Sequence, residues 1–160
     1  AARLQAILIE RGVPSDLVEA ALSVNVERVS DAGKRAEALA AFRREADFTE
    51  LAATFKRVIN ILPKGFSKSV DPRRFVSSAE RALHSEATTL RAETEHLVHA
   101  GDYVRALQLI AAIRPIVDMF FEEVMVMVED RDLQENRLAI LQEVADLFCG
   151  IANFSKIMAS

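Results

Sequence analysis

Three side chains that can contact nucleic acid share one helical face in this chain. Lys56, Arg57 and Asn60 follow i, i+1, i+4 spacing, which places them on the same side of a helix. Lys and Arg bind phosphate, whereas Asn offers a donor and an acceptor that can read the edge of a base. Lys64 and Lys68 lie in the loop that follows and add positive charge. The pattern favours an RNA-binding surface, although the solvent-exposed face of any amphipathic helix can look the same.

Catalytic and metal-binding patterns are not evident. The loop sequence PKGFSK lacks the GxxxxGK[ST] spacing of a phosphate-binding loop, and neither GxSxG nor HExxH occurs. His96 and His99 stand three positions apart on one predicted helix, with Glu93 or Glu95 as the nearest third ligand. Solvent-exposed histidines are the better interpretation of this pair and of His84. We therefore predict no catalytic residue, no metal site and no cofactor in this chain.

Two other residue pairs carry alternatives. Phe120 and Phe121 precede an apolar run, which indicates a helix–helix interface, with a stacking surface for bases as the second possibility. Asn136 and Arg137 open the last predicted helix, opposite its apolar stripe. We expect them to form hydrogen bonds and ion pairs that hold the break at 129–132 against the preceding helix.

Charge is unevenly distributed along the sequence. The net charge is −4, but residues 28–91 carry 13 Lys and Arg against 8 Asp and Glu. Residues 92–160 carry 5 against 12. Because phosphate attraction is screened within about 10 Å, a polyanion should meet the 28–91 half. Ordinary variation between solvated helix faces is the alternative.

The spacing of apolar residues is helical nearly throughout, and no segment alternates strongly enough to be a strand. We predict an all-α bundle of about seven helices, with 1–27 as a helical segment that continues from a longer protein and 28–160 as the main bundle. The run 124–128 is the one ambiguous place. The first predicted helix ends at Gly12, and the second runs from Pro14 to about Ser23. The next two run from 30 to 45 and from a capping box at Asp47 and Glu50 to Leu62. The last three run from Pro72 to 100, from 102 to 123 with a kink at Pro115, and from 133 onward.

Further expectations concern packing and compartment. The apolar stripes of 102–123 and of the last helix should face each other along their length. Cys149 lies among apolar neighbours, which predicts a buried, unreactive thiol. A single cysteine and no export signal favour the cytoplasm, and no apolar run is long enough for a membrane span.

The order of several segments resembles the C-terminal anticodon-binding domain, of the DALR type, of the bacterial glycyl-tRNA synthetase beta subunit. The segment AATFKRVINIL, at 52–62, is similar to that family's AANKRVxNIL, although Phe55 stands where the family commonly has Asn. A piece at 79–83, the stretch YVRALQLIAAIRPIVDMFFEEVMVMVED and the segment NRLAIL follow in the family's order. The last helix has LFCGIANFSKI in place of the family's LFxxVADFSxL.

The resemblance implies a DALR-like architecture and a role in tRNA recognition. In that family, two alpha and two beta subunits activate glycine with ATP and transfer it to tRNA, and the alpha subunit carries the aminoacylation site. The implied partners are therefore tRNA and the alpha subunit, with ATP used by the parent enzyme and not by this segment. The arginyl-tRNA synthetase anticodon domain is the nearest alternative family. A helical protein-interaction module without an RNA role is the alternative from another class.

Overall fold

The computed structural model describes residues 9, 12–22, 29–44 and 48–151, and within these ranges all regular secondary structure is helical. The predicted all-α class is therefore confirmed, and the run 124–128 forms bends and no strand. The described elements are seven α-helices and one 3₁₀ turn: α2 (Ser15–Leu22), α3 (Val29–Arg43), α4 (Phe48–Ile61), η1 (Pro72–Arg74), α5 (Ser78–His99), α6 (Tyr103–Ala111), α7 (Arg114–Glu123) and α8 (Arg131–Cys149). Most of the predicted first helix, and the residue Asp47 of the predicted capping box, lie outside the described residues.

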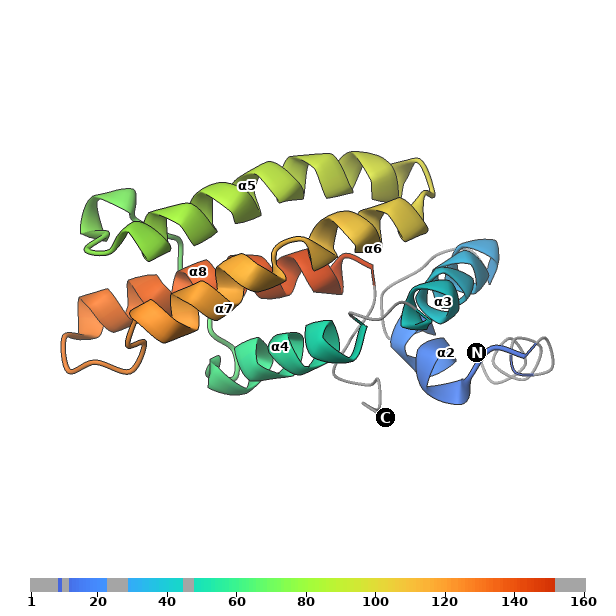
Figure 1. Ribbon diagram of the computed structural model, residues 1–160, viewed down its shortest axis with the longest axis horizontal. Coiled ribbons are helices and arrows are strands. Elements are labelled where there is room, and N and C mark those ends of the chain that lie inside the picture. The colour runs from blue at the N-terminus through green and yellow to red at the C-terminus, as the bar shows by residue number, and fades with distance from the viewer. Residues whose placement is uncertain (1–8, 10–11, 23–28, 45–47, 152–160) are drawn as a thin grey trace.

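The long helices run side by side along the molecule (Figure 1). α5 packs against α8 and against the α6–α7 pair, while α4 packs against α8 and α7. The α2–α3 pair lies at the right of Figure 1, where α3 contacts α6 and α4. Because α5 has 22 residues, about 33 Å of helix, it lines both α8 and the α6–α7 pair.

One continuous hydrophobic core joins these helices. Phe55 of α4 and Phe148 of α8 meet within it, with ring centroids 4.6 Å apart. Burial of each such side chain stabilises the fold by roughly 1.5–3 kcal/mol. Its largest fully buried members are Leu17, Leu39, Phe42, Leu51, Phe55, Leu83, Leu107, Ile110, Phe120 and Phe148.

The last helix packs differently from the prediction. We expected α8 to lie lengthwise on residues 102–123, but its extended contacts are with α5 and α4. The reason is that α8 is covered on several sides: Ala139, Ile140, Ala145 and Leu147 are buried in addition to its predicted stripe. A helix buried on most sides has no single stripe whose partner can be read from spacing.

Two predicted helix boundaries are wrong. The segment 102–123 is two helices, α6 and α7, separated at Ala112 and Ile113, so Pro115 lies in the first turn of α7 and not inside a kinked helix. A proline there interrupts no hydrogen bond, because the first-turn N–H groups have no helical acceptor. The next helix back, α5, begins after Ser77 and not at Pro72: the Ser77 and Glu80 side chains form a reciprocal capping box, whereas Pro72 opens only η1.

The end of α8 is closed by a side chain from a distant part of the sequence. The buried guanidinium of Arg35, in α3, donates to the carbonyl oxygens of Gly150 and Ile151 at 2.8 Å each. Its charge complements the negative end of the helix. The neighbouring Cys149 is exposed, so the prediction of a buried thiol is wrong. Desolvation by the groups around the thiol, and the carboxylate of Asp146, still raise its pKa.

Candidate nucleic-acid interface

α4 separates its apolar and polar residues cleanly. Leu51, Phe55 and Val58 are buried, whereas Arg57 and Asn60 are exposed on the opposite side and Lys56 is half-buried. Since Phe55 packs on α8, this position cannot read a base. The three polar side chains predicted to contact RNA therefore share the outer side of α4, as their spacing indicated.

Arg57 makes a tertiary contact that the sequence did not reveal. Its guanidinium carbon lies 4.1 Å from the centroid of the Phe121 ring, so the cation covers an aromatic face of α7. Two polar contacts fasten the same pair of helices: Arg114 binds Glu50 at 3.1 Å, and Thr54 lies 3.4 Å from an oxygen of Asp118. Arg57 is thus held beside α7.

The loop after α4 exposes two lysines and is held by its own backbone and by packing on the core. Gly65 has φ +75°, a conformation that favours glycine, and the Phe66 N–H donates to the Pro63 carbonyl at 3.0 Å. Phe66 is half-buried against the core, whereas Lys64 and Lys68 are exposed. The loop therefore directs its cations outward.

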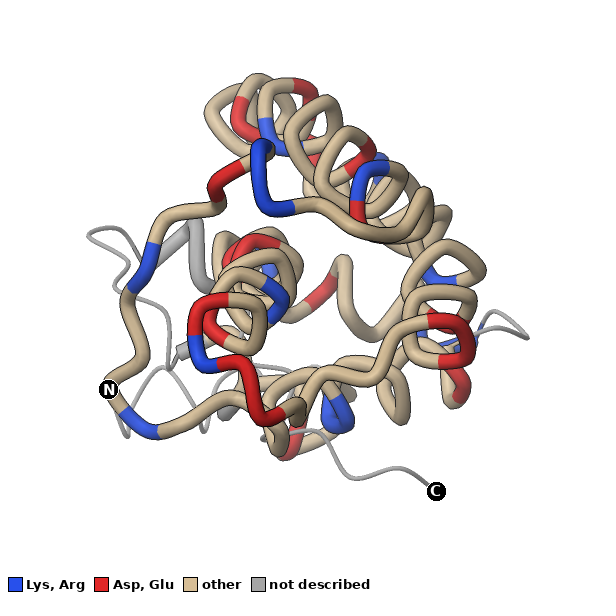
Figure 2. The backbone as a smooth tube through the Cα atoms, turned by 90° about the vertical axis from the view of Figure 1, so that its left-hand side faces the viewer, with Lys and Arg blue, Asp and Glu red and all other residues tan. Residues whose placement is uncertain are grey.

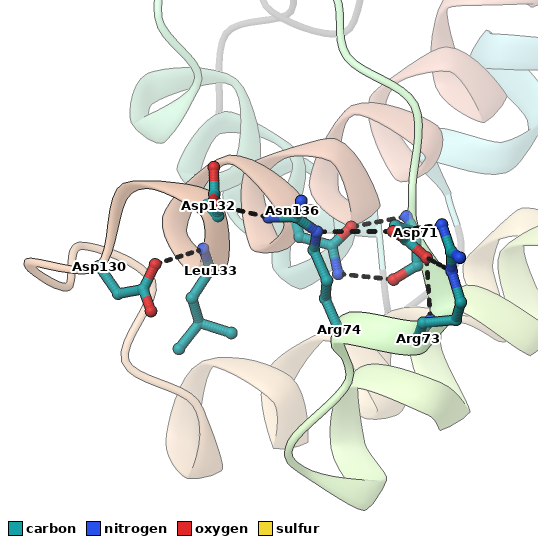
Figure 3. A network of polar contacts seen from close by, with 7 residues as sticks. All are labelled: Asp71, Arg73, Arg74, Asp130, Asp132, Leu133 and Asn136. Atoms are coloured by element: carbon teal, nitrogen blue, oxygen red, sulfur yellow. Dashed lines mark hydrogen bonds and ion pairs between the residues drawn. The ribbon is translucent and has the colours of Figure 1, made fainter.

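The end of this loop is bound to α8 by Asn136 (Figure 3). Its side-chain oxygen accepts from the Asp71 N–H at 2.7 Å, and its side-chain N–H donates to the Asp71 carbonyl at 3.1 Å. Arg74 reaches from η1 to Asp132, at 3.1 Å. These side chains border a recess of about 200 Å³ lined by Lys68, Ser69, Asp71, Arg74, Asp132, Glu135 and Asn136.

Asp71 remains charged under more acidic conditions than an ordinary aspartate. Its carboxylate accepts from the side chain and the backbone N–H of Arg73, and these bonds lower the pKa of Asp71 below its usual value of 3.8. The carboxylate of Asp132 raises the pKa of Arg74. The start of η1 is therefore a charged network of fixed geometry.

Arg137 is buried, although we expected it on the exposed side of the last helix. It donates to the carbonyl of Met125 and lies 3.3 Å from Glu80, which is fully buried. Arg137 does form a hydrogen bond and an ion pair, as expected, but with other partners. Arg137 joins the 124–128 bends to the start of α5, and Asn136 holds Asp71, so neither side chain ties 129–132 to α7.

The two charged halves of the sequence do not form separate surfaces. Ion pairs cross between them, as Arg74 with Asp132 and Arg114 with Glu50 show. Figure 2 looks at the end of the bundle that lies at the left of Figure 1, and basic and acidic positions stand next to each other there. Within the described ranges, Lys56, Lys64 and Lys68 form no ion pair, so these three cations of α4 and its loop are available to an outside anion.

The histidines divide into two kinds. His96 and His99 are exposed on α5. His84 is half-buried, with its Nδ1 atom 2.6 Å from a carboxylate oxygen of Glu143 and its ring edge-on to Phe75. The description of all three as solvated is therefore wrong for His84. In the portion of the chain that the structure covers, no three His, Cys, Asp or Glu residues are grouped to hold a metal ion.

Comparison with known proteins identifies the relatives of the chain. It is 43% identical over 144 residues to the glycine–tRNA ligase beta subunit of Citrifermentans bemidjiense, which covers 90% of this chain. The beta subunits of Syntrophotalea carbinolica and Desulforapulum autotrophicum are each 44% identical and cover 96% and 97% of the chain. Its homologues are glycine–tRNA ligase beta subunits. No family model matches the chain.

The likeness to glycine–tRNA ligase beta subunits extends over nearly all of this chain but over little of theirs. The chain spans 21%, 22% and 23% of the length of these three relatives, or about a fifth of a beta subunit. Because the matches cover nine-tenths or more of the chain, they favour the glycyl family over the arginyl alternative. None of the described helices is both long and apolar enough to cross a membrane.

Proposed function

We propose that this chain is the tRNA-recognition bundle of a glycine–tRNA ligase beta subunit, of the DALR anticodon-binding type. The similarity to beta subunits over 90% or more of the chain carries the proposal. In the proposed assembly, two beta subunits join two alpha subunits in the cytoplasm and charge tRNA with glycine at the expense of ATP. Residues 28–160 form the recognition bundle, and 1–27 precede it.

The proposed RNA-binding surface consists of Lys56, Arg57 and Asn60 on α4 together with Lys64 and Lys68 in the following loop. Three arguments support this choice: Arg57, Asn60 and the loop lysines are exposed, the three lysines lack acidic partners within the described residues, and the loop is held in place by Asn136. Phosphate contacts by lysine supply affinity, and an unpaired loop base offers its edge to a side-chain amide.

A binding experiment tests this function. The full-length protein that contains this chain is titrated with the anticodon stem-loop of a glycine tRNA and with a stem-loop of scrambled loop sequence, at two salt concentrations. We expect tighter binding of the glycine stem-loop and weaker binding of both at higher salt. Equal affinity for the two loops would contradict anticodon recognition, and no binding at low salt would contradict an RNA role.

The chain itself is proposed to take no part in glycine activation. No phosphate-cradling motif occurs in its sequence, so the chemistry is assigned to the rest of the parent enzyme. The purified chain, with its helical content verified by circular dichroism, should give no glycine-dependent exchange of pyrophosphate into ATP. Exchange above the level without glycine would show that this view is wrong.

A protein-binding role is the second candidate, and exposed methionines favour it. Met125 and Met127 are 72% and 59% exposed in the 124–128 bends, and Val76 nearby is 76% exposed. Flexible thioether side chains suit an apolar protein contact. Changing both methionines to Gln distinguishes the candidates, because an RNA-recognition surface on α4 should keep its affinity in this variant while a protein contact through the bends should be lost.

A further inference from the structure

A layered arrangement of planar groups connects α4 to α7. The exposed guanidinium of Arg57 lies 4.1 Å from the centroid of the Phe121 ring. Phe121 is half-buried and meets Phe120 edge-on, with centroids 6.0 Å apart and an interplanar angle of 75°. Phe120 is fully buried in the core. The guanidinium is therefore the outermost of three neighbouring planar groups that lead from the interior to the surface.

We propose that Arg57 is a stacking surface for one unpaired nucleobase, with Phe121 as the residue that positions it. This inference rests on the proposed function, because it names what the α4 surface binds. A guanidinium is flat and weakly hydrated, so its uncovered face accepts the ring of a base as readily as an aromatic side chain does. Phe121 occupies the inner face and leaves the outer face to the ligand.

The contact with Phe121 also limits the mobility of Arg57. A free arginine loses rotamer entropy when it is fixed on a ligand. Here Phe121 restrains the side chain before any ligand arrives, which reduces that loss. Among the described residues, Arg57 has no hydrogen-bond or ion-pair partner, so its N–H groups are not committed elsewhere.

The charges around the stack favour a neutral ring over a phosphate. Glu122 and Glu123 follow Phe121 directly and are exposed, whereas Asp118, one turn earlier in α7, is paired with Arg114 at 3.3 Å. The end of α7 beyond Phe121 is therefore acidic, which disfavours a phosphate there more than an uncharged base. The lysines of α4 and its loop remain the sites for phosphate.

Asn60 stands where it can read the base that stacks on Arg57. The two residues are three positions apart on α4 and both are exposed, so their side chains are neighbours on one face. The stacked ring fixes the plane of the base, and the amide then meets its edge. Stacking alone tolerates every base, so selectivity at this position comes from the amide.

This inference is tested by substitutions that keep the net charge but remove a planar side-chain group. Arg57→Lys retains the positive charge, and Phe121→Leu removes the support of the guanidinium. Arg91→Lys is the matched control, because Arg91 is an exposed arginine on α5 whose side chain is 70% accessible. Each variant of the full-length protein is titrated with glycine-tRNA anticodon stem-loops, either intact or with one loop base removed to leave an abasic sugar. Thermal melts verify that each variant is folded.

We expect Arg57→Lys and Phe121→Leu to bind the intact stem-loop roughly 5- to 100-fold more weakly than the unchanged protein, with the same salt slope. At one loop position, removal of the base should weaken binding by the unchanged protein and by Arg91→Lys, but should have little further effect in the two stack variants. Wild-type affinity of Arg57→Lys, or an equal cost of every abasic position in all proteins, would overturn the stacking role and leave the proposed function standing. Absence of stem-loop binding by the unchanged protein would overturn both.

Discussion

Asn136 and Asp71 exchange two hydrogen bonds although they are 65 positions apart, and this side chain is what connects the lysine-bearing loop to α8. Asn136 is 4% exposed, so its amide is largely removed from water, and both of these hydrogen bonds hold backbone. Because both Asp71 groups are satisfied by one side chain, the end of the loop has one fixed position relative to α8.

Replacement of Asn136 by Ala should free the end of that loop. The Asp71 N–H and carbonyl would lose their partner in a partly buried place, which costs about 1–3 kcal/mol of unfolding free energy. Urea unfolding measures the loss, and hydrogen exchange should become faster at Asp71. Glu135→Ala is the control, since among the described residues Glu135 pairs only with the exposed Arg131, and its loss should change stability by less than about 0.5 kcal/mol. Equal effects of the two substitutions would contradict the anchoring role.

The destabilising effects of mutating Arg137 and Glu80, which form an ion pair, should not be additive. Arg137→Met leaves the fully buried Glu80 carboxylate without its cation, and such a loss destabilises by about 3–5 kcal/mol. Adding Glu80→Gln removes the stranded charge while its amide oxygen still accepts from the Ser77 N–H, which now bonds to Glu80 at 3.1 Å. The double variant should therefore be more stable than Arg137→Met alone in urea unfolding. A double variant that loses the sum of both single effects would show that the two charges do not depend on each other.

The helices could be predicted from the sequence because their signals are local. Apolar residues at helical spacing and glycine or proline at the ends placed α2, α3 and α4 close to their observed bounds. The same logic separated the polar side of α4 from its buried side. The start of α5 was misplaced because Asp71–Pro72 and Ser77–Glu80 both resemble helix starts, and only the second is followed by a continuous α-helix.

The tertiary contacts could not be predicted, because they depend on which helices become neighbours. Arg57 meets Phe121 only because α4 packs against α7, and spacing within either helix says nothing of this. Asn136 and Arg137 lie on a side of α8 that its apolar stripe does not reveal, because α8 is buried on most faces and these two polar residues are also inside. The residues of the proposed interface were found from their types, whereas the residues that hold them in position required the fold.

The lowered pKa of Asp71 predicts a network that persists into acid. A carboxyl whose pKa is depressed by folding contributes stability above its unfolded pKa, and this contribution is lost as the pH falls through the folded value. Asp71 should therefore remain mostly charged at pH 3.8, its ordinary midpoint, because Arg73 donates to it from both side chain and backbone. An NMR titration of the Asp71 carboxyl should give a midpoint below 3.8 in the unchanged protein and a higher one in Arg73→Ala. A midpoint unaffected by Arg73→Ala would contradict this cause.

Lys56 and Asn60 should contribute to RNA binding in different ways. Lys56→Ala removes one proposed phosphate contact, so affinity should fall for every stem-loop and the salt slope should decrease by about one unit. Asn60→Ala leaves the charge unchanged but removes the group that reads a base edge, so it should reduce discrimination between anticodon sequences by roughly 1–3 kcal/mol, as bidentate amide contacts to bases do in duplexes.

Competition between matched and mismatched stem-loops on the full-length protein distinguishes these two contributions. Arg131→Ala is the control, because Arg131 lies in the acidic half, is highly exposed and pairs only with Glu135 among the described residues. Arg114 would be a poor control, since it fastens α7 to α4 through Glu50. If Lys56→Ala and Asn60→Ala keep affinity and selectivity while Arg131→Ala abolishes binding, RNA meets the start of α8, and the α4 surface is not the interface.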